Sequence, residues 1–407
     1  MRRLAGLALM FIAASAVMLA PTSACARENA RHFTLGADRR AYNDARGHGW
    51  EDANRFSVKV PEGNYRVTLA FGGAEASDTT VKAEGRRLMV ESLHTGKGET
   101  ATRSFIVNVR TPALGAPPEN APGGAAVRLK PREIGSPTWD DRLTLEFLGS
   151  APRVTAIAIE PIDVPTVYLL GDSTVTDQTA EPAASWGQML PRFFAPTIAV
   201  ANHAESGETL KSFLAELRLD KALSRMKPGD WVLIQFGHND QKAQWPQTYA
   251  EAETTYRAYL RAYIAEVRRR GATPLLVTSP ERRNFDSRGK ITPSHGRYPD
   301  AVRAVAREEK VGLIDLTPMT IAFYEALGPQ RAPLAFNDDG RDRTHHNNYG
   351  AYELARMIAS RLFEADPKLA QHLLPEARDY DPANPSPPEA FRLPASTARS
   401  ARRPDGD

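Results

Sequence analysis

The hydrophobic period of the chain changes at Asp163-Val164-Pro165, and this change constrains the fold more than any other feature. From Phe33 to about Ile162, apolar and polar residues alternate in short runs. Beyond Pro165, apolar runs of strand length alternate with segments of helical period. A period of two is typical of antiparallel strands, whereas alternating strands and helices favour a parallel sheet covered on both faces. The sequence therefore predicts two domains of different class.

The first domain, which we place at residues 30–163, is predicted to be an antiparallel β-sandwich. Its short alternating runs are separated by turn residues, and the expected strands are 56–60, 65–71, 104–109, 143–147 and 154–159. The Pro-, Gly- and Ala-rich stretch 111–125 predicts a long internal loop. Trp50, Tyr65 and Trp139 either pack in the sandwich core or form a surface on which sugars stack; the pattern does not separate the two.

The second domain, placed at residues 165–365, is predicted to be a three-layer α/β fold with a doubly wound, flavodoxin-like parallel sheet. Parallel strands joined by right-handed helical crossovers give this arrangement. The expected strands are 166–171, 198–201, 230–236, 273–278 and 311–316, and the expected helices are 254–270, 301–309 and 349–363.

Polar residues follow the predicted strands where each strand ends, and ligands of such sheets bind at that edge. The run Val167–Leu170 stops at Gly171-Asp172-Ser173. The second strand is followed by Asn202-His-Ala-Glu-Ser-Gly207, and the third by Gly237-His-Asn-Asp240. Asp342-Arg-Thr-His345 precedes the last helix.

Together these segments resemble the four conserved blocks of the SGNH (GDSL-type) hydrolases. Gly-Asp-Ser-Thr, the Ser-Trp-Gly at 185–187, Phe-Gly-His-Asn-Asp and Asp-x-Thr-His look most like the rhamnogalacturonan acetylesterase branch. The resemblance covers roughly residues 165–363. It implies an oxyanion hole made by the backbone N–H groups of Ser173 and Gly207 and the side-chain amide of Asn239. In related esterases a galactose-binding-like β-sandwich often precedes the catalytic domain, and residues 30–163 look similar to it.

The residue types predict a catalytic triad of Ser173, His345 and Asp342. A serine hydroxyl needs a base to accept its proton, and His345 is the best candidate. Asp342 would orient the imidazole and stabilise its protonated form; alternatively, Asp342 and Asn347 only cap a helix. The D-x-x-H spacing of the family that the chain resembles implies His345 as the base. Adjacent side chains point in different directions, so only one of His345 and His346 can face Ser173.

Several other polar residues lie near these blocks. Arg282 and Arg283 could bind a uronate carboxylate, or they belong to a solvated loop, and His346 is a further substrate-binding candidate. Asp172 and Asp240 either support the catalytic loops or are structural turn acids. His238 is interpreted as a packed loop histidine.

The predicted function is removal of acetyl esters from a plant cell-wall polysaccharide. The resemblance alone implies that this polysaccharide is rhamnogalacturonan or pectin. Acetylxylan or another glycan is an alternative substrate, and a lipase or thioesterase of the same superfamily is an alternative enzyme. A carbohydrate-binding protein is the non-enzymatic alternative. No cofactor is implied, and no metal is expected because ligand spacings such as H-E-x-x-H are missing from the sequence.

Charge and the first residues bear on partners and localisation. With 52 basic and 49 acidic side chains, the chain has no basic excess for nucleic acid. Arg2-Arg3, the apolar run 4–20 and Ala24-Cys25-Ala26 predict a signal peptide at 1–26, hence a secreted or periplasmic protein. No stable membrane association is expected. A lipoprotein anchored through Cys25, the single cysteine, is the alternative, although Thr22 stands where such sites usually have an aliphatic residue.

Residues 375–407 are rich in Pro, Ser, Ala and Arg and lack an apolar period. A segment that cannot bury apolar surface usually stays disordered. We therefore expect this tail to be disordered.

Overall fold

The computed structural model describes residues 30–36 and 39–406. The predicted signal peptide, with Cys25, lies outside these residues. In the described part of the chain, no helix is both long and apolar enough to span a bilayer.

The second half of the chain forms a parallel sheet of five strands in the order β11-β10-β12-β13-β14. All neighbouring pairs are parallel. Because β11 lies on one side of β10 and the later strands lie on the other, the chain reverses its winding direction at β10. This is the predicted doubly wound sheet. The strands are β10 (Thr166–Gly171), β11 (Ala199–Asn202), β12 (Trp231–Gln235), β13 (Thr273–Val277) and β14 (Gly312–Ile314).

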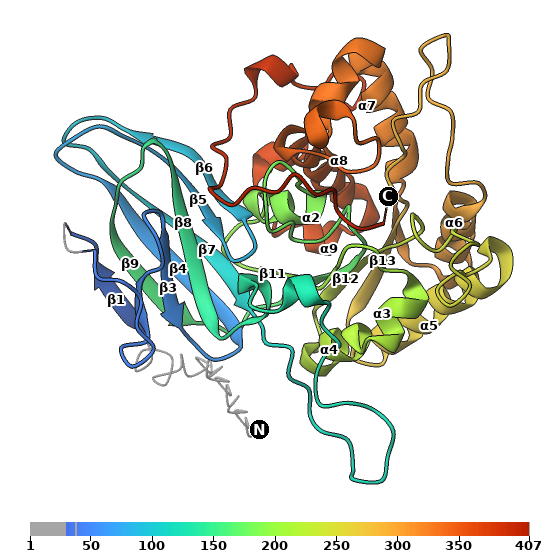
Figure 1. Ribbon diagram of the computed structural model, residues 1–407, viewed down its shortest axis with the longest axis horizontal. Coiled ribbons are helices and arrows are strands. Elements are labelled where there is room, and N and C mark those ends of the chain that lie inside the picture. The colour runs from blue at the N-terminus through green and yellow to red at the C-terminus, as the bar shows by residue number, and fades with distance from the viewer. Residues whose placement is uncertain (1–29, 37–38, 407) are drawn as a thin grey trace, which may run out of the picture.

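Helices cover both faces of this sheet (Figure 1). One face packs on α3 (Leu210–Ala215), α4 (Arg218–Arg225), α5 (Arg257–Arg268) and α6 (Tyr298–Glu309). The other packs on α2 (Trp186–Met189), α7 (Leu316–Arg331), α8 (Asn348–Ala365) and α9 (Pro367–Ala370). The apolar stripe predicted for α5 is buried through Leu260, Tyr263, Ile264 and Val267. The strands bury apolar side chains on both faces, which explains their uninterrupted hydrophobic runs.

The first half of the chain forms two antiparallel sheets around a separate core, as predicted. One sheet has the order β1-β9-β4-β7 and the other β2-β3-β8-β5-β6. Alternate residues of the long strand β4 are buried, which is the period of two seen in the sequence. The strands are β1 (Arg31–Thr34), β2 (His48–Trp50), β3 (Arg55–Lys59), β4 (Gly63–Gly72), β5 (Ser77–Ala83), β6 (Arg87–Thr95), β7 (Thr100–Val109), β8 (Arg142–Ala151) and β9 (Val154–Pro161).

The hairpin β5–β6 was not predicted, because charged residues replace the expected apolar alternation. Lys82, Arg86 and Arg87 are buried in this hairpin. They form ion pairs with the catalytic domain: Arg87 Nε lies 2.7 Å from Asp177 Oδ2, and Arg86 Nη2 lies 2.5 Å from Glu181 Oε1. The hairpin is therefore the face of the sandwich that docks beside the serine loop.

The aromatic residues considered for sugar stacking lie in the core. Trp50, Tyr65 and Trp139 are 9%, 6% and 7% exposed. Trp139 packs under the Arg110 guanidinium, 4.5 Å from the ring centroid, and its indole N–H donates to Glu133. The predicted loop 111–125 extends away from both domains at the bottom of Figure 1.

The structure differs from the expectation of a disordered tail. Residues 375–406 follow the surface of the catalytic domain and are held by both apolar and polar contacts. Ala377 is buried, and Tyr380, Phe391 and Leu393 pack against the core of that domain. Ser396 is buried; its hydroxyl donates to Glu146 Oε2 (2.6 Å) and accepts from Lys82 Nζ (3.0 Å). Its backbone N–H donates to Glu181 Oε1 at 2.9 Å. Separate apolar contacts together with a paired, buried polar group can order a segment that has no apolar period.

Candidate active site

Ser173 lies just beyond the carboxyl end of the central strand β10. The strand ends at Gly171, where a Cβ atom would lie 2.5 Å from Val175 Cγ2 and 2.8 Å from the Gln235 carbonyl oxygen. Only glycine leaves room for this sharp exit from the sheet. The Asp172 carbonyl then accepts the backbone N–H groups of Val175 and Thr176, both at 3.0 Å. This turn fixes Ser173 at the edge of the sheet where ligands of such folds bind.

A continuous chain of hydrogen bonds joins Ser173, His345 and Asp342. Ser173 Oγ lies 2.9 Å from His345 Nε2, and His345 Nδ1 lies 2.9 Å from Asp342 Oδ2. Asp342 Oδ1 accepts the backbone N–H groups of Thr344 and His345 at 2.9 and 3.0 Å. Asn347, and not Asp342, caps α8, because its side chain accepts from the first turn of that helix.

Asp342 is held in its ionised form. Burial opposes its charge, but the hydrogen bond and charge of His345, with the two backbone N–H donors, outweigh burial and lower the pKa of Asp342 to about 2. An ionised carboxylate at Nδ1 favours the imidazole tautomer whose Nε2 is free to accept a proton. Ser173 and His345 therefore have the geometry of a nucleophile and its base.

Gly207 and Asn239 lie together beside the serine loop. The loop that carries Gly207 is tied to β10, because the Glu205 N–H donates to the Gly171 carbonyl at 3.2 Å. Gly207 has φ +81°, a conformation that favours glycine. Asn239 Nδ2 donates to the Glu208 carbonyl at 3.0 Å, which fixes the amide next to Gly207. These groups can donate hydrogen bonds to a developing oxyanion.

We expect Asn239→Ala to lower kcat by about 10²–10³-fold with a much smaller change in KM. The amide is aimed at charge that develops only in the transition state, so its loss affects turnover more than substrate binding. Steady-state kinetics with a soluble acetyl ester give both constants. A loss confined to KM would contradict this role for Asn239.

Asp172 and Asp240 support the loops around the site. Asp172 Oδ1 accepts from the N–H and hydroxyl of Thr174 at 3.0 and 2.8 Å, and Oδ2 lies 3.2 Å from His238 Nδ1. Asp240 accepts the backbone N–H groups of Gly237 and Leu210. Burial raises the pKa of Asp240 to about 7. The structure thus favours the support role over that of simple turn acids, and it gives His238 a carboxylate partner.

The three substrate-binding candidates are engaged in internal contacts. Arg283 donates to the carbonyls of Gly340 and Asp342 and lies over the Phe336 ring. Arg282 donates to the His238 carbonyl at 3.3 Å. His346 is buried, with Nε2 2.8 Å from the Tyr324 hydroxyl. Both arginines therefore hold the loops that carry His345 and His238, and the His346 ring is directed toward α7 through Tyr324.

The buried His346 predicts a specific acid sensitivity of the fold. Burial, with the neighbouring charge of His345, lowers the pKa of His346 to about 3, against about 6.5 for an unfolded histidine. As pH falls below about 6.5, the unfolded chain therefore binds a proton that the folded chain does not. The contribution of His346 to stability is complete above about pH 6.5 and is lost toward pH 3, by about 1.4 kcal/mol per pH unit.

We expect this contribution to disappear in His346→Gln, which can still hydrogen bond to Tyr324. The free energy of unfolding of the parent minus that of the variant should fall as the pH is lowered from 7 to 4. Urea unfolding at several pH values measures it, and other titrating groups cancel in the difference. A difference that is constant across this range would contradict a neutral, buried His346.

Sequence reasoning missed a layer of polar residues beneath the serine loop. Gln178 Nε2 donates to the Ser173 carbonyl at 2.8 Å. Asn202 Nδ2 donates to the Val175 carbonyl at 2.7 Å and to Asp177 Oδ1 at 2.8 Å. Gln235 Nε2 donates to Thr174 Oγ1 at 2.9 Å. The available signal was the position of Asn202 and Gln235, which are the polar last residues of otherwise apolar strands.

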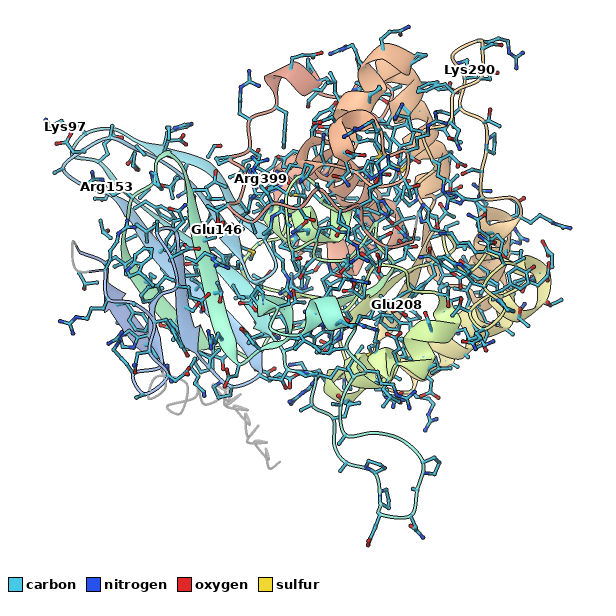
Figure 2. The ribbon with its side chains drawn as sticks, viewed as in Figure 1. Lys97, Glu146, Arg153, Glu208, Lys290 and Arg399 are labelled. Atoms are coloured by element: carbon cyan, nitrogen blue, oxygen red, sulfur yellow. The ribbon has the colours of Figure 1, made fainter. Side chains whose placement is uncertain are left out.

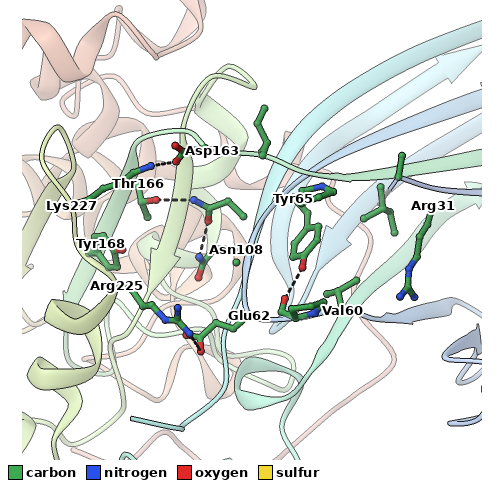
Figure 3. Close-up of a pocket in the computed structure, with 17 residues that line it drawn as sticks. Arg31, Val60, Glu62, Tyr65, Asn108, Asp163, Thr166, Tyr168, Arg225 and Lys227 are labelled. Carbon is green, nitrogen blue, oxygen red and sulfur yellow. Dashed lines mark hydrogen bonds and ion pairs between the residues drawn. The ribbon is translucent and has the colours of Figure 1, made fainter. Parts of the chain in front are cut away.

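A cavity of about 880 Å³ is lined by Tyr65, Asn108, Tyr168 and other residues (Figure 3). It is between the two domains, at the amino end of β10, where Thr166 accepts a hydrogen bond from Asn64. Arg225 and Lys227 at its wall are paired with Glu62 and Asp163. This cavity shares no residue with the Ser173 site. Within residues 30–36 and 39–406, no cluster of three or more His, Cys, Asp or Glu side chains could hold a metal ion.

Comparison with known proteins agrees with this geometry. The model of the GDSL-like Lipase/Acylhydrolase family matches residues 169–352, which include Ser173, Gly207, Asn239, Asp342 and His345. The rhamnogalacturonan acetylesterase RhgT of Bacillus subtilis (strain 168) is 38% identical over 221 residues, covering 51% of this chain and 94% of that protein. The probable rhamnogalacturonan acetylesterase YesY of the same organism is 36% identical over 213 residues, covering 52% and 98%.

A third relative extends beyond the catalytic domain. The uncharacterized esterase YxiM of Bacillus subtilis (strain 168) is 29% identical over 320 residues, covering 77% of this chain and 75% of that protein. The crystal structure of the YxiM protein covers 83% of this chain and 88% of its own, at 28% identity and a TM-score of 0.48.

Proposed function

This chain belongs to the GDSL-like lipase/acylhydrolase family and is a carboxylic ester hydrolase; from that premise we propose that it removes acetyl groups from rhamnogalacturonan. The observation that carries the proposal is the hydrogen-bonded chain from Ser173 Oγ through His345 to Asp342. A relative that is 38% identical to this chain over 221 residues is named a rhamnogalacturonan acetylesterase.

In the proposed first step, Ser173 Oγ attacks the acetyl carbonyl carbon while His345 Nε2 takes the hydroxyl proton. The oxygen of the tetrahedral intermediate carries the negative charge and is stabilised by the N–H groups of Ser173 and Gly207 and by the Asn239 amide. The bond from the carbonyl carbon to the sugar oxygen then breaks. His345 returns its proton to that oxygen, so the sugar leaves as an alcohol and Ser173 is left acetylated.

In the second step, water attacks the acetyl-serine while His345 Nε2 accepts a proton from the water. A second oxyanion forms in the same position, and the carbon–Oγ bond breaks. Ser173 recovers its proton from His345, and acetic acid leaves and loses its remaining proton to solvent as acetate. Asp342, with its pKa lowered to about 2, stays ionised and stabilises the imidazolium in both steps.

The substrate part of the proposal rests on the two relatives named as rhamnogalacturonan acetylesterases. The triad specifies acyl transfer and not the alcohol, so acetylxylan is the alternative glycan. We also propose that the protein is exported, because the sequence of residues 1–26 has the regions of a signal peptide.

The proposal is tested by measuring acetate release from acetylated rhamnogalacturonan, acetylated xylan and a set of simple esters of increasing acyl length. We expect the highest kcat/KM on the acetylated rhamnogalacturonan, with activity on simple esters falling as the acyl chain grows. A higher kcat/KM on acetylated xylan would make xylan the substrate and leave the proposed esterase reaction unchanged. Preference for long acyl chains would favour a lipase or thioesterase.

A further inference from the structure

The segment 399–406, called here the crossing segment, runs from the sandwich across the catalytic domain to the active site. Figure 1 shows it in dark red, and Figure 2 labels Arg399 where the segment leaves the sandwich. Its start is firmly attached: the Glu181 N–H donates to the Ala398 carbonyl at 2.8 Å, and the Ser400 N–H donates to the Glu181 carbonyl at 2.9 Å. Glu181 itself is buried.

The end of the crossing segment covers the oxyanion donors. A Cβ atom on Gly406 would lie 2.8 Å from Asn239 Oδ1, 3.2 Å from Asn239 Nδ2 and 3.3 Å from Gly207 Cα. A Cβ atom on Gly207 would in turn lie 3.7 Å from Asp405 Cβ. Lys242 Nζ donates to the Gly406 carbonyl at 2.6 Å. In this arrangement Ser173 is only 1% exposed and Asn239 is fully buried, so a polymeric ester cannot reach them.

The carboxylate of Asp405 pairs with Arg132 beside this position. Arg132 is held by the loop that carries Gly207, because its guanidinium donates to Glu205 Oε1 at 2.9 Å and to the Ser206 carbonyl at 2.7 Å. A third of the Arg132 side chain is exposed. An N–H group of the Arg132 guanidinium therefore faces the carboxylate of Asp405. Asp405 directly precedes Gly406, which covers the oxyanion donors, and consecutive Cα atoms are only about 3.8 Å apart.

The contacts that hold the end of the segment are of a kind that opens easily. Asp405 also pairs with Arg402 at 2.9 Å, and Arg403 pairs with Asp338 at 3.0 Å, with partly exposed side chains in both pairs. Exposed ion pairs contribute little to stability and are weakened by salt. A cavity of about 170 Å³ already lies between the segment and the serine loop, lined by Arg132, Trp139, Gln178, Ser206 and Asp405 among others.

We propose that the crossing segment occupies the substrate site of the folded chain, and that Arg132, which it engages through Asp405, binds a carboxylate of an acidic glycan once the segment has left. This rests on the proposed function, because it names the class of acetylated glycan that the same site takes. Arginine forms strong, directional hydrogen bonds with carboxylates. Beside the site, Lys242 stacks on Trp245, an exposed ring on which a sugar can pack.

The first arm of the test removes the occupant. A chain ending at Ser400 keeps the buried anchor at Ser396 and loses every contact of the crossing segment with the site. We expect its kcat/KM for para-nitrophenyl acetate to rise by about tenfold. This is the rise expected if the crossing segment leaves the site free in about a tenth of the full-length molecules. Gly406→Val in the full chain should act in the same direction, because a side chain there clashes with Asn239. Unchanged or lower activity in both folded variants would overturn the occupancy.

The second arm, made in the chain ending at Ser400, tests Arg132. The ratio of kcat/KM for acetylated oligogalacturonide, which is acidic, to that for acetylated xylo-oligosaccharide, which is neutral, is measured for each variant. We expect Arg132→Gln to lower this ratio about tenfold, the value of a hydrogen bond to a charged group. Arg128→Gln is the matched control, because Arg128 is an exposed arginine four residues before Arg132 in the chain. This variant should leave the ratio unchanged.

The failures of the two proposals are distinguishable. An unchanged ratio in Arg132→Gln, in a protein that still cleaves acetyl esters, overturns the carboxylate site and leaves the esterase standing. Failure of the chain ending at Ser400 and of the full chain to cleave any acetyl ester, although both are folded by circular dichroism, overturns the proposed function itself.

Discussion

Replacing Ser173 by alanine is expected to lower kcat for acetyl-ester hydrolysis by at least about 10⁴-fold, because loss of the nucleophile leaves only oxyanion and binding effects. The side chain is buried and its Oγ bonds His345, so the change removes one oxygen and leaves a small, apolar group. Acetate release by the purified variant measures the loss.

The control for this variant is its fold, followed by thermal unfolding. Losing one buried hydrogen bond changes the free energy of unfolding by about 1 kcal/mol, so the variant should unfold close to the parent. A folded Ser173→Ala protein with turnover within about tenfold of the parent would identify a different nucleophile, since triad loss has far larger effects.

His345→Ala is expected to be as damaging as Ser173→Ala, whereas its neighbour His346→Gln is expected to retain most activity. His345 Nε2 bonds Ser173 Oγ, but His346 Nε2 bonds the Tyr324 hydroxyl. Of the two histidines, only His345 lies within hydrogen-bonding distance of the serine hydroxyl. Triad members act as a unit, so the double variant of Ser173 and His345 should lose little more than either single variant.

The pair of histidines is a matched comparison, because the two residues are adjacent and both are 1% exposed. Any general cost of disturbing this loop falls on both variants. An active His345→Ala protein together with an inactive His346→Gln protein would show that the base had been assigned to the wrong histidine.

The parallel sheet and its site could be predicted because both leave local signals in the sequence. β10 and β12 are buried on both faces, so they are recognisable as apolar runs. Ser173 and Asn239 lie two and four residues beyond the last residues of these strands. Asp342 and His345 are three residues apart, and the structure brings them to Ser173, 172 residues from His345 in sequence.

The parts that could not be predicted depend on contacts between distant segments. β5 and β6 carry Lys82 and Arg87, which look like surface residues until Glu181 and Asp177 are placed against them. The tail is held in part by Ser396, whose partners Glu146 and Lys82 are in the sandwich. The sequence does not show whether a charged or hydroxyl side chain has a partner in the folded protein.

The substrate candidates show the same limit. Arg282 and Arg283 were selected because they follow a strand, yet their guanidinium groups bond backbone carbonyls of the site loops. Arg132 lies within the first domain, far in sequence from every motif, and reaches the Gly207 loop only in the folded chain. Local pattern predicted the residues of the hydrogen-bonded chain from Ser173 to Asp342 better than the contacts around that chain.

The central claim, that Ser173 is the nucleophile of an acetylesterase, is tested most directly by a serine-directed phosphonate ester. We expect acetate-releasing activity to fall in proportion to the phosphonate bound, to reach zero at one equivalent, and the label to be found by mass spectrometry on the peptide that contains Ser173. Loss of activity with the label on another residue, or full activity after Ser173 is labelled, would contradict the claim.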